Sequence, residues 1–492
     1  MGPPPLVPLV PVARLSDAWP RSGAAGRESA PPHGTDMISA TRRRISSMSR
    51  RVRHDGGDRL LSSVREYSGQ YLTIVSGSAA RLTIQAAYFV LLANTLSLTE
   101  FGLFAGISAA GIIIGSFAGL GFASAAYRIA ATRSILIGRY LAGVYVTFLI
   151  STPLCIACAY LLYELAFAGR VALSTYLAIA VSDILLWRLL EVVSQVNNGL
   201  GNFYQASTGP VIGSGSRLVA AVIFKLTFTT LDEWALMYLV ANGVGTAFCI
   251  WAFSPSRRVC FRRVVPLIIG RLRDSLLFAF SFFIFYTQSE LDKLIATLLV
   301  DGRTAGIYAI SMRVLDLTSV PVRGFLALLV REIMRNGGQR SKWSAGLLIE
   351  AGLAAISLLG FALIALVLTE EPTILGHQVA EAASLFMFMP LVPPLKNLQE
   401  YHAELFFAWR RMDVRAFTAV LLTVMKAALT VIIFLTARDL RHMGLLFNLS
   451  FAVTYAASAA ILFLTFYRTR PVAGLIGNVD RLDGAVTRQA AP

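Results

Sequence analysis

The sequence predicts an all-α polytopic membrane protein with about twelve transmembrane helices in two six-helix lobes. Two features of its composition lead to this fold class. Hydrophobic residues make up 56% of the 492 residues, charged residues only 15%, and the mean hydropathy is +0.64. A soluble domain carries roughly 25% charged residues, and one water-soluble core stops growing at roughly 250–300 residues. A lipid bilayer can surround this many apolar residues, whereas water cannot.

The third observation is the length of the apolar runs. About 20 apolar residues cross a hydrocarbon core, whereas a barrel strand needs only about ten alternating residues. The runs are long and do not alternate, so we expect helices. The expected spans of the first half are residues 71–96, 103–122, 141–162, 172–193, 211–228 and 234–253. Those of the second half are residues 276–300, 306–330, 345–368, 379–398, 417–437 and 445–466.

Charge gives the expected orientation, because Lys and Arg collect in cytoplasmic loops. With the N-terminus inside, the inner segments hold most of the 44 Lys and Arg residues. The outer loops are short and often acidic, and their basic residues are Arg170, Arg303, Arg438 and Arg441. Both termini are therefore expected in the cytoplasm. The net charge of +16 follows from this bias and from anionic lipid headgroups.

The chain divides into five expected parts. Residues 1–66 are rich in Pro, Ala and Gly and then polybasic, which predicts a disordered basic cytoplasmic tail and not a signal peptide. Translation could instead begin at Met37 or Met48. The first lobe is then residues 67–253, a basic cytoplasmic linker is 254–274, the second lobe is 275–467 and a cytoplasmic tail is 468–492.

Motifs of soluble catalysis are missing from the sequence. It contains no Walker A motif, Gly-rich nucleotide loop or nucleophile elbow, and its histidines lack metal-ligand spacing. Cys155 and Cys158 form a C-x-x-C inside an expected span, where small residues on a helix face are the simpler interpretation. No segment is long enough to form a basic nucleic-acid module. We expect no enzyme, no cofactor, no metal site and no nucleic-acid partner.

An internal repeat relates the two halves. The stretch Phe101-Gly102-Leu103-Phe104-Ala105 matches Ala305-Gly306-Ile307-Tyr308-Ala309, and the same offset lays most of the first expected span on the seventh. Both halves then begin inside, which makes the repeat parallel. Two six-helix lobes around a central cavity are a common plan of secondary transporters.

These motifs also carry a resemblance. The stretch Gln288–Lys293, followed by Ala305–Ala309, resembles the seventh-to-eighth helix region of polysaccharide (Wzx-type) flippases. Phe101–Phe104, running into Gly119–Phe122, resembles their second helix. These flippases belong to the multidrug/oligosaccharidyl-lipid/polysaccharide (MOP) transporter superfamily, which includes the MATE transporters.

The resemblance implies a V-shaped two-lobe fold that works by alternating access. It implies a flippase in the bacterial inner (plasma) membrane, which moves undecaprenyl-diphosphate-linked oligosaccharide units for exopolysaccharide or O-antigen export. The implied partners are the lipid bilayer, this substrate and a coupling ion, H⁺ or Na⁺, in antiport. A polysaccharide polymerase and glycosyltransferases are further implied partners.

Charged residues inside the expected spans are the candidate site residues, because such charges are costly in a membrane and are usually paired or functional. Several cations have an acid three or four residues away on the same helix. These pairs are Arg188 with Glu191, Lys293 with Glu290, Arg313 with Asp316, and Lys396 with Glu400. The cations without such a partner are Arg81, Arg217, Lys225, Arg323 and Lys426.

A diphosphate is an anion that Arg binds through its planar fork of donors. We therefore expect a diphosphate–sugar cavity formed by Arg81, Arg217, Arg313, Arg323 and Lys426. Lys225 lies near a span end and can snorkel outward. Cross-helix ion pairs that consume every cation are the alternative interpretation. The candidates for ion coupling are Asp183, Asp292, Asp316 and Glu350.

Two other functions remain open at this stage. A multidrug exporter of the same superfamily needs an acidic or aromatic cavity for cationic drugs. A membrane polymerase or glycosyltransferase typically has a large outer loop, which this sequence lacks. A lipid II flippase, which is closely related to the polysaccharide flippases, also remains open.

Prolines at Pro321, Pro390, Pro393 and Pro394 are expected to kink or break their helices.

Overall fold

The computed structural model describes residues 80–468, apart from 256–258, 372, 410 and most of 320–342. All regular structure in these residues is helical. The described part of the chain begins with the helix Ala80–Ala93. The first half continues with α2 (Leu98–Gly115), η1 (Ala118–Gly121), α3 (Ala123–Thr132), η2 (Ser134–Leu136), α4 (Ile137–Leu162), η3 (Tyr163–Phe167), α5 (Leu173–Val181), η4 (Ser182–Leu186), α6 (Trp187–Leu200), α7 (Phe203–Thr227) and α8 (Leu231–Phe253).

The second half begins with α9, the longest described helix. Its helices are α9 (Val264–Leu299), α10 (Gly302–Thr318), α12 (Trp343–Glu370), α13 (His377–Phe386), α14 (Val392–Ala408), α15 (Met412–Thr436) and α16 (Leu440–Arg468). Each expected span overlaps a helix. The span at 379–398 is divided into α13 and α14 at the turn that contains Pro390, as the prolines predicted.

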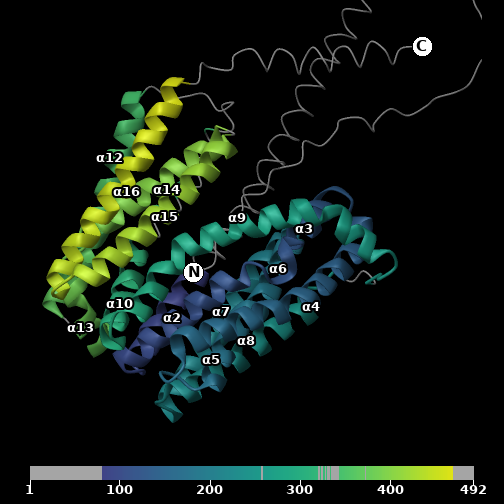
Figure 1. The fold of residues 1–492 in the computed structure, drawn as a ribbon, viewed down its shortest axis with the longest axis horizontal. Helices are drawn as coiled ribbons and strands as arrows, with labels where there is room; N and C mark the ends of the chain where they lie inside the picture. The colour runs from purple at the N-terminus through teal and green to yellow at the C-terminus, as the bar shows by residue number, and fades with distance from the viewer. Residues whose placement is uncertain are drawn as a thin grey trace, which may run out of the picture.

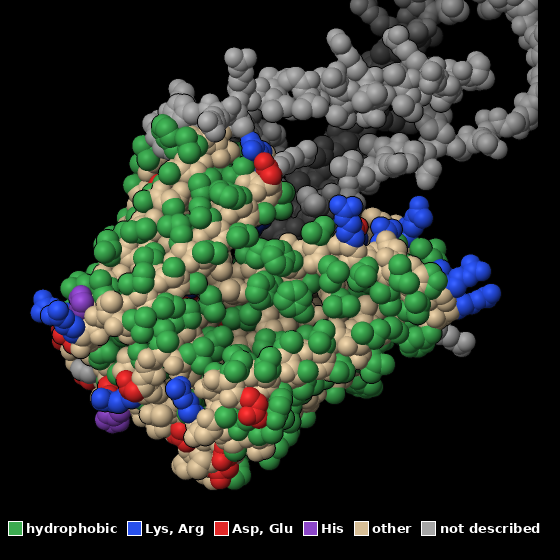
Figure 2. Space-filling view, viewed as in Figure 1, with side chains coloured by type: hydrophobic (Ala, Val, Ile, Leu, Met, Phe, Trp, Pro, Cys, Tyr) green, Lys and Arg blue, Asp and Glu red, His purple; other side chains and the backbone are tan. Residues whose placement is uncertain are grey.

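Seven of the described helices are long and apolar enough to cross a membrane: 98–115, 134–167, 203–227, 231–253, 346–370, 412–436 and 440–465. The expected spans outside this set are interrupted or carry charge. For example, α9 contains Glu290, Asp292 and Lys293, and α10 contains Arg313 and Asp316. Figure 2 shows a face covered mostly by hydrophobic side chains, with charged side chains mainly at the ends of the bundle. The chain is a multi-pass membrane protein.

The helices form two lobes (Figure 1). One contains α2 to α8 and the other contains α12 to α16, while α9 and α10 pack against both. In particular, α2 contacts both α9 and α10, α9 contacts α15, and α10 contacts α13. The two lobes therefore meet along the helices that contain the repeated motif.

The repeated motif begins equivalent helices. Ser97 caps α2 through a reciprocal capping box with Glu100, and Asp301 caps α10 by accepting a hydrogen bond from the backbone N–H of Thr304. The glycines of the two motifs then meet. A Cβ on Gly102 would lie 2.7 Å from the backbone nitrogen of Gly306, and a Cβ on Gly306 would clash with the carbonyl of Leu98. Only glycine allows the two helix backbones this close approach.

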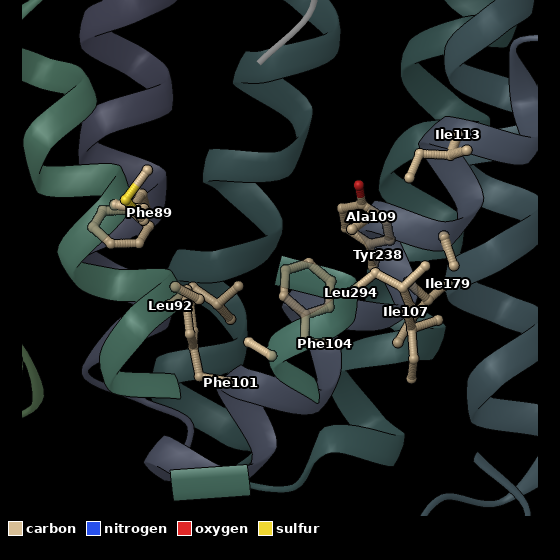
Figure 3. Close-up of a cluster of buried hydrophobic side chains, with 14 of the residues drawn as sticks. Phe89, Leu92, Phe101, Phe104, Ile107, Ala109, Ile113, Ile179, Tyr238 and Leu294 are labelled. Carbon is tan, nitrogen blue, oxygen red and sulfur yellow. The ribbon is translucent and has the colours of Figure 1, made fainter. Parts of the chain in front are cut away.

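A hydrophobic core surrounds α2 (Figure 3). Phe101 packs edge-on against Phe89 of the helix Ala80–Ala93, and Phe104 packs edge-on against Tyr238 of α8. Leu294 of α9 belongs to the same cluster. This core fixes α2 between the first lobe and α9, next to the cavity described below.

Candidate functional site

A central cavity of about 110 Å³ lies between the first lobe and the pair α9 and α10. Its walls come from the helix Ala80–Ala93 and from α2, η4, α6, α7, α8, α9 and α10. The aromatic lining residues are Tyr88, Phe89, Phe101, Phe104, Trp187, Tyr238 and Tyr286. The charged lining residues are Asp183, Arg188, Arg217, Glu290, Lys293 and Arg313. Basic groups therefore outnumber acidic groups on the described wall.

Asp183 is the acidic centre of the first-lobe wall. It lies in the π-helical turn η4, a distortion that often marks functional positions. Its carboxylate accepts hydrogen bonds from the Ser108 hydroxyl at 2.7 Å and the Tyr238 hydroxyl at 2.8 Å. A guanidinium nitrogen of Arg217 lies 3.6 Å away. Arg217 has no acidic partner on its own helix, as the spacing indicated, and this contact is of the cross-helix kind that the alternative interpretation described.

The guanidinium of Arg217 is only partly satisfied by this contact. Its Nε donates to the side-chain oxygen of Asn242 at 2.8 Å, and its plane lies over the rings of Trp187 and Tyr238, at 4.2 Å and 4.9 Å. Its Nη2 is buried without a hydrogen-bond acceptor. A buried donor of this kind costs about 1–3 kcal/mol when nothing accepts from it.

Two further arginines close to Trp187 share this property. Arg188 donates to Glu191 and to the carbonyl of Ile112, but its buried Nε has no acceptor. Arg81 has a buried Nε without an acceptor, and its guanidinium lies 5.5 Å from the centre of the Trp187 ring. The guanidinium groups of Arg81 and Arg217 thus lie near the Trp187 indole and that of Arg188 lies over the Tyr286 ring, and each has a buried N–H without an acceptor.

The opposite wall belongs to α9 and α10. Lys293 and Glu290 form the expected pair on α9, with 2.5 Å between nitrogen and oxygen, and both line the cavity. Arg313 also lines the cavity. The expected pair of Arg313 with Asp316 is wrong: no acid forms an ion pair with Arg313 within the described residues, and Asp316 pairs with Lys396 of α14. Arg313 therefore faces the cavity as a free cation there.

Lys426 and Asp292 lie outside the described lining of this cavity. Lys426 of α15 lies 2.9 Å from a carboxylate oxygen of Asp292, and it also donates to the carbonyl of Gln288. The Tyr308 hydroxyl donates to the same carboxylate oxygen of Asp292, at 2.8 Å. Lys426 was expected to line the cavity. It lies outside the described lining, and it pairs with Asp292, an acid on another helix.

The remaining expected site residues lie elsewhere. Glu350 is on α12, where it contacts His402 and Tyr455 and not a Lys or Arg side chain. Arg323 lies outside the described residues. Lys225 is exposed near the end of α7, as snorkelling requires. The structure thus gathers Arg81, Arg217, Arg313 and Asp183 at or beside the cavity, and it separates Lys426, Asp292, Asp316 and Glu350 from it.

Sequence reasoning missed several residues of the cavity. Trp187 and Tyr238 supply the ring faces under Arg217, and Arg188 was assigned only to a local pair with Glu191. A sequence signal for Trp187 and Arg188 did exist: they are adjacent on one helical turn beside the intramembrane Asp183. Tyr238 had no comparable signal, because its neighbours on α8 are apolar.

Comparison with solved structures identifies the fold. An inward-facing MATE family multidrug resistance transporter of the MOP superfamily matches with a TM-score of 0.55 and 17% identity, over 79% of this chain and 96% of that one. The lipid II flippase MurJ in an inward closed conformation matches with a TM-score of 0.55 and 14% identity, over 81% and 88%. An outward-facing MATE transporter matches with a TM-score of 0.51 and 18% identity, over 81% and 97%.

No protein-family model matches the chain, and no curated protein sequence matches it either. At these identities the likeness concerns the fold. The chain has the two-lobe fold of MATE transporters and MurJ, which confirms the predicted fold class.

Proposed function

We propose that this protein is a flippase that moves a lipid-linked oligosaccharide diphosphate across a bacterial inner membrane. One observation carries the proposal: Arg81, Arg188 and Arg217 each keep a buried N–H without an acceptor beside the central cavity. Phosphate oxygens are strong acceptors, and charge-assisted hydrogen bonds from arginine to phosphate are roughly twice as strong as neutral ones. An anionic headgroup would satisfy the three donors together.

The rest of the cavity suits the same headgroup. Arg313 places positive charge on the opposite wall, where Lys293 is paired with Glu290, so a diphosphate between the walls would contact both sides. The aromatic side chains of Phe101, Phe104 and Tyr88 offer ring faces to sugars. The lipid tail would remain in the bilayer, because moving it through a polar cavity would expose apolar surface at a cost of about 0.8 kcal/mol per CH₂ group.

Alternating access is the proposed mechanism. The cavity lies between the first lobe and α9–α10, so a relative movement of the lobes would change the side to which it opens. The MATE structures that this chain resembles include inward-facing and outward-facing conformations. We further propose that residues 254–274 and both termini are cytoplasmic, because the basic segments then lie inside. Glycosyltransferases and a polymerase are the proposed partners before and after the flipping step.

A multidrug exporter is the second candidate, favoured by the MATE likeness and by the aromatic lining. Cationic drugs bind acidic or aromatic cavities, whereas the described wall carries Arg188, Arg217, Lys293 and Arg313 against Asp183 and Glu290. The surplus of basic groups supports an anionic cargo over a cationic one.

The test reconstitutes the purified protein into liposomes. The probe is a fluorescent nitrobenzoxadiazole-labelled polyprenyl-diphosphate disaccharide, and the impermeant reductant dithionite reports its leaflet. We expect protein-dependent movement of this probe, with little movement of a matched lipid that has the same sugar but no phosphate. Lipid II in the same assay distinguishes the two diphosphate cargos. Transport of ethidium without movement of either diphosphate lipid would replace the flippase proposal with the exporter.

A further inference from the structure

The second lobe contains a buried histidine–carboxylate pair that the central cavity does not use. The Nε2 of His402 on α14 lies 3.3 Å from a carboxylate oxygen of Glu350 on α12. The other carboxylate oxygen accepts a hydrogen bond from the Tyr455 hydroxyl of α16 at 2.8 Å. The Nδ1 of His402 lies 2.8 Å from the hydroxyl of Ser458, also on α16. Three helices of the lobe thus meet at one histidine.

The pair is well placed to change its protonation state. His402 is fully buried, while the side chain of Glu350 keeps 13% of its surface exposed. With a neutral imidazole and an ionised carboxylate the pair has a net charge of −1, and one added proton makes it neutral. Ser458 permits this change, because its hydroxyl can donate to a bare Nδ1 or accept from a protonated one. The ring of Tyr455, stacked on His402 at 5.5 Å, holds the imidazole in place.

Within the described residues, no Lys or Arg side chain forms an ion pair with Glu350. The neighbouring cluster is apolar and includes Leu353, Leu398, Leu405 and Leu462. A net charge in such surroundings is costly, so uptake of a proton would remove an unfavourable state. The other charged groups on α14 and on the helices packed against it have contacts of their own. Glu404 pairs with Arg415 of α15, Lys396 pairs with Asp316 of α10, and Glu400 also has an interaction partner. Tyr401 and Tyr455 are the other titratable groups that face the pair.

A groove between α12 and α16 gives access to the site. It is lined by Glu350 and Tyr455 together with apolar residues such as Leu347, Ala459 and Leu462. The carboxylate of Glu350 is the part of the pair that this groove exposes, and the same carboxylate contacts the buried Nε2 of His402. Within the described residues, no group of three or more His, Cys, Asp and Glu side chains could hold a metal ion. The geometry at this pair fits a proton better than a larger cation.

We propose that Glu350 and His402 form the proton-binding site through which a proton gradient drives transport, and that the coupling ion is therefore H⁺. This inference rests on the proposed function for the identity of the cargo. The protonation site itself does not depend on the cargo. Because the pair joins α12, α14 and α16, its charge state acts on the packing of the whole second lobe.

The first experiment measures the proton directly and needs no substrate. Protein labelled with ¹⁵N-histidine is titrated from pH 5 to pH 9 by NMR, and the His402 signals are assigned by their loss in H402Q. We expect the His402 signals to change with pH, and to change over a lower pH range in E350Q, because the neutral amide no longer stabilises the imidazolium. A His402 signal that stays in one protonation state, or a midpoint unchanged in E350Q, would overturn the proposal.

The second experiment measures coupling in proteoliposomes with the fluorescent disaccharide diphosphate probe. Potassium and valinomycin hold the membrane potential at zero while a pH gradient is imposed. Wild-type protein should enrich the probe in one leaflet, whereas E350Q should only equilibrate it between leaflets. The exposed His377 supplies the matched control, so H377Q should behave as wild type. Equal enrichment by wild type and E350Q would overturn the proton site, whereas a wild-type protein that moves no probe would count against the proposed function alone.

Discussion

At the residue scale, the cavity is organised by arginines whose hydrogen bonds are incomplete. Arg217 illustrates the point, since it has two roles that a substitution can separate. Its Nη2 lies 3.6 Å from a carboxylate oxygen of Asp183, which is too far for a hydrogen bond, so this one buried nitrogen both faces the carboxylate and has no hydrogen-bond acceptor. One role neutralises a buried carboxylate and the other offers a contact to an anionic ligand.

We predict that Arg217→Ala reduces the flipping rate of the disaccharide diphosphate probe at least tenfold, which corresponds to about 1.4 kcal/mol. Arg217→Lys should recover part of the rate, because it keeps the charge and loses the planar fork. Lys225→Ala is the control, since it removes a cation from the exposed end of the same helix. If Arg217 only neutralises Asp183, then the double variant with Asp183→Asn will regain full activity. If it binds the substrate, the double variant will remain slow.

The sequence predicted part of this site and missed the rest for a physical reason. Helical spacing identifies ion pairs within one helix, and the Arg188–Glu191 and Lys293–Glu290 pairs are confirmed. Spacing carries no information about contacts between helices that are distant in sequence. For this reason the partners of Arg217 and Lys426, which are Asp183 and Asp292, were not identified.

At the scale of elements, the contact of α2 with α10 is the closest junction between the two halves. Gly102 and Gly306 bring the first turns of these helices together, directly after their N-caps at Ser97 and Asp301. The repeated motif in the sequence indicated two equivalent helices. Their mutual contact could not be predicted, because a repeat shows similarity between segments and not proximity.

We predict that Gly306→Ala destabilises the protein by about 1–3 kcal/mol, the usual cost of overpacking, because the new methyl group would clash with the backbone carbonyl of Leu98. The measurement is thermal unfolding in detergent, followed by fluorescence-detected size-exclusion chromatography. Gly352→Ala in α12 is the matched control, since a Cβ there meets no atom within 4 Å. Equal melting temperatures for the two variants would show that the α2–α10 contact can widen without cost.

The boundaries of the elements were less predictable than their existence. The expected span at 172–193 consists of α5, the π-turn η4 and the first part of α6. Asp183 in η4 and Arg188 in α6 both line the cavity, although the stretch around them is apolar. Hydropathy detects that such a segment is buried in the membrane. It does not detect a local change of helical register, which depends on the hydrogen bonds of Asp183 with Ser108 and Tyr238.

At the scale of the whole molecule, the loops between the helices lie in two groups, one at each end of the helix bundle. The start of α8 contacts the start of α2 through Leu231 and Glu100, and Asn94 donates to the carbonyl of Leu375 before α13. The α9–α10 turn joins this end through the Gly102–Gly302 contact. At the other end, Arg128 pairs with Asp274, and the N–H of Cys260 donates to the carbonyl of Gly138.

These two groups agree with the loops that charge assigned to opposite sides. Glu100, Asp232, Glu233 and Asp301 belong to the first end, whereas Arg128, Arg139 and the arginines near Asp274 belong to the second. The geometry thus requires the two groups to face opposite compartments, whichever compartment each one faces. Positive-inside bias predicts that the basic end is the cytoplasmic one.

We therefore predict that alkaline phosphatase fused after residue 258 is inactive and that the same enzyme fused after residue 302 is active, because the reporter folds only outside the cytoplasm. Green fluorescent protein at the same two positions supplies the converse control and should fluoresce only after residue 258. Activity of the phosphatase after residue 258, together with fluorescence after residue 302, would invert the orientation and place the basic loops outside. Equal behaviour at the two positions would contradict the fold itself, because α9 would then not cross the membrane between the two ends of the bundle.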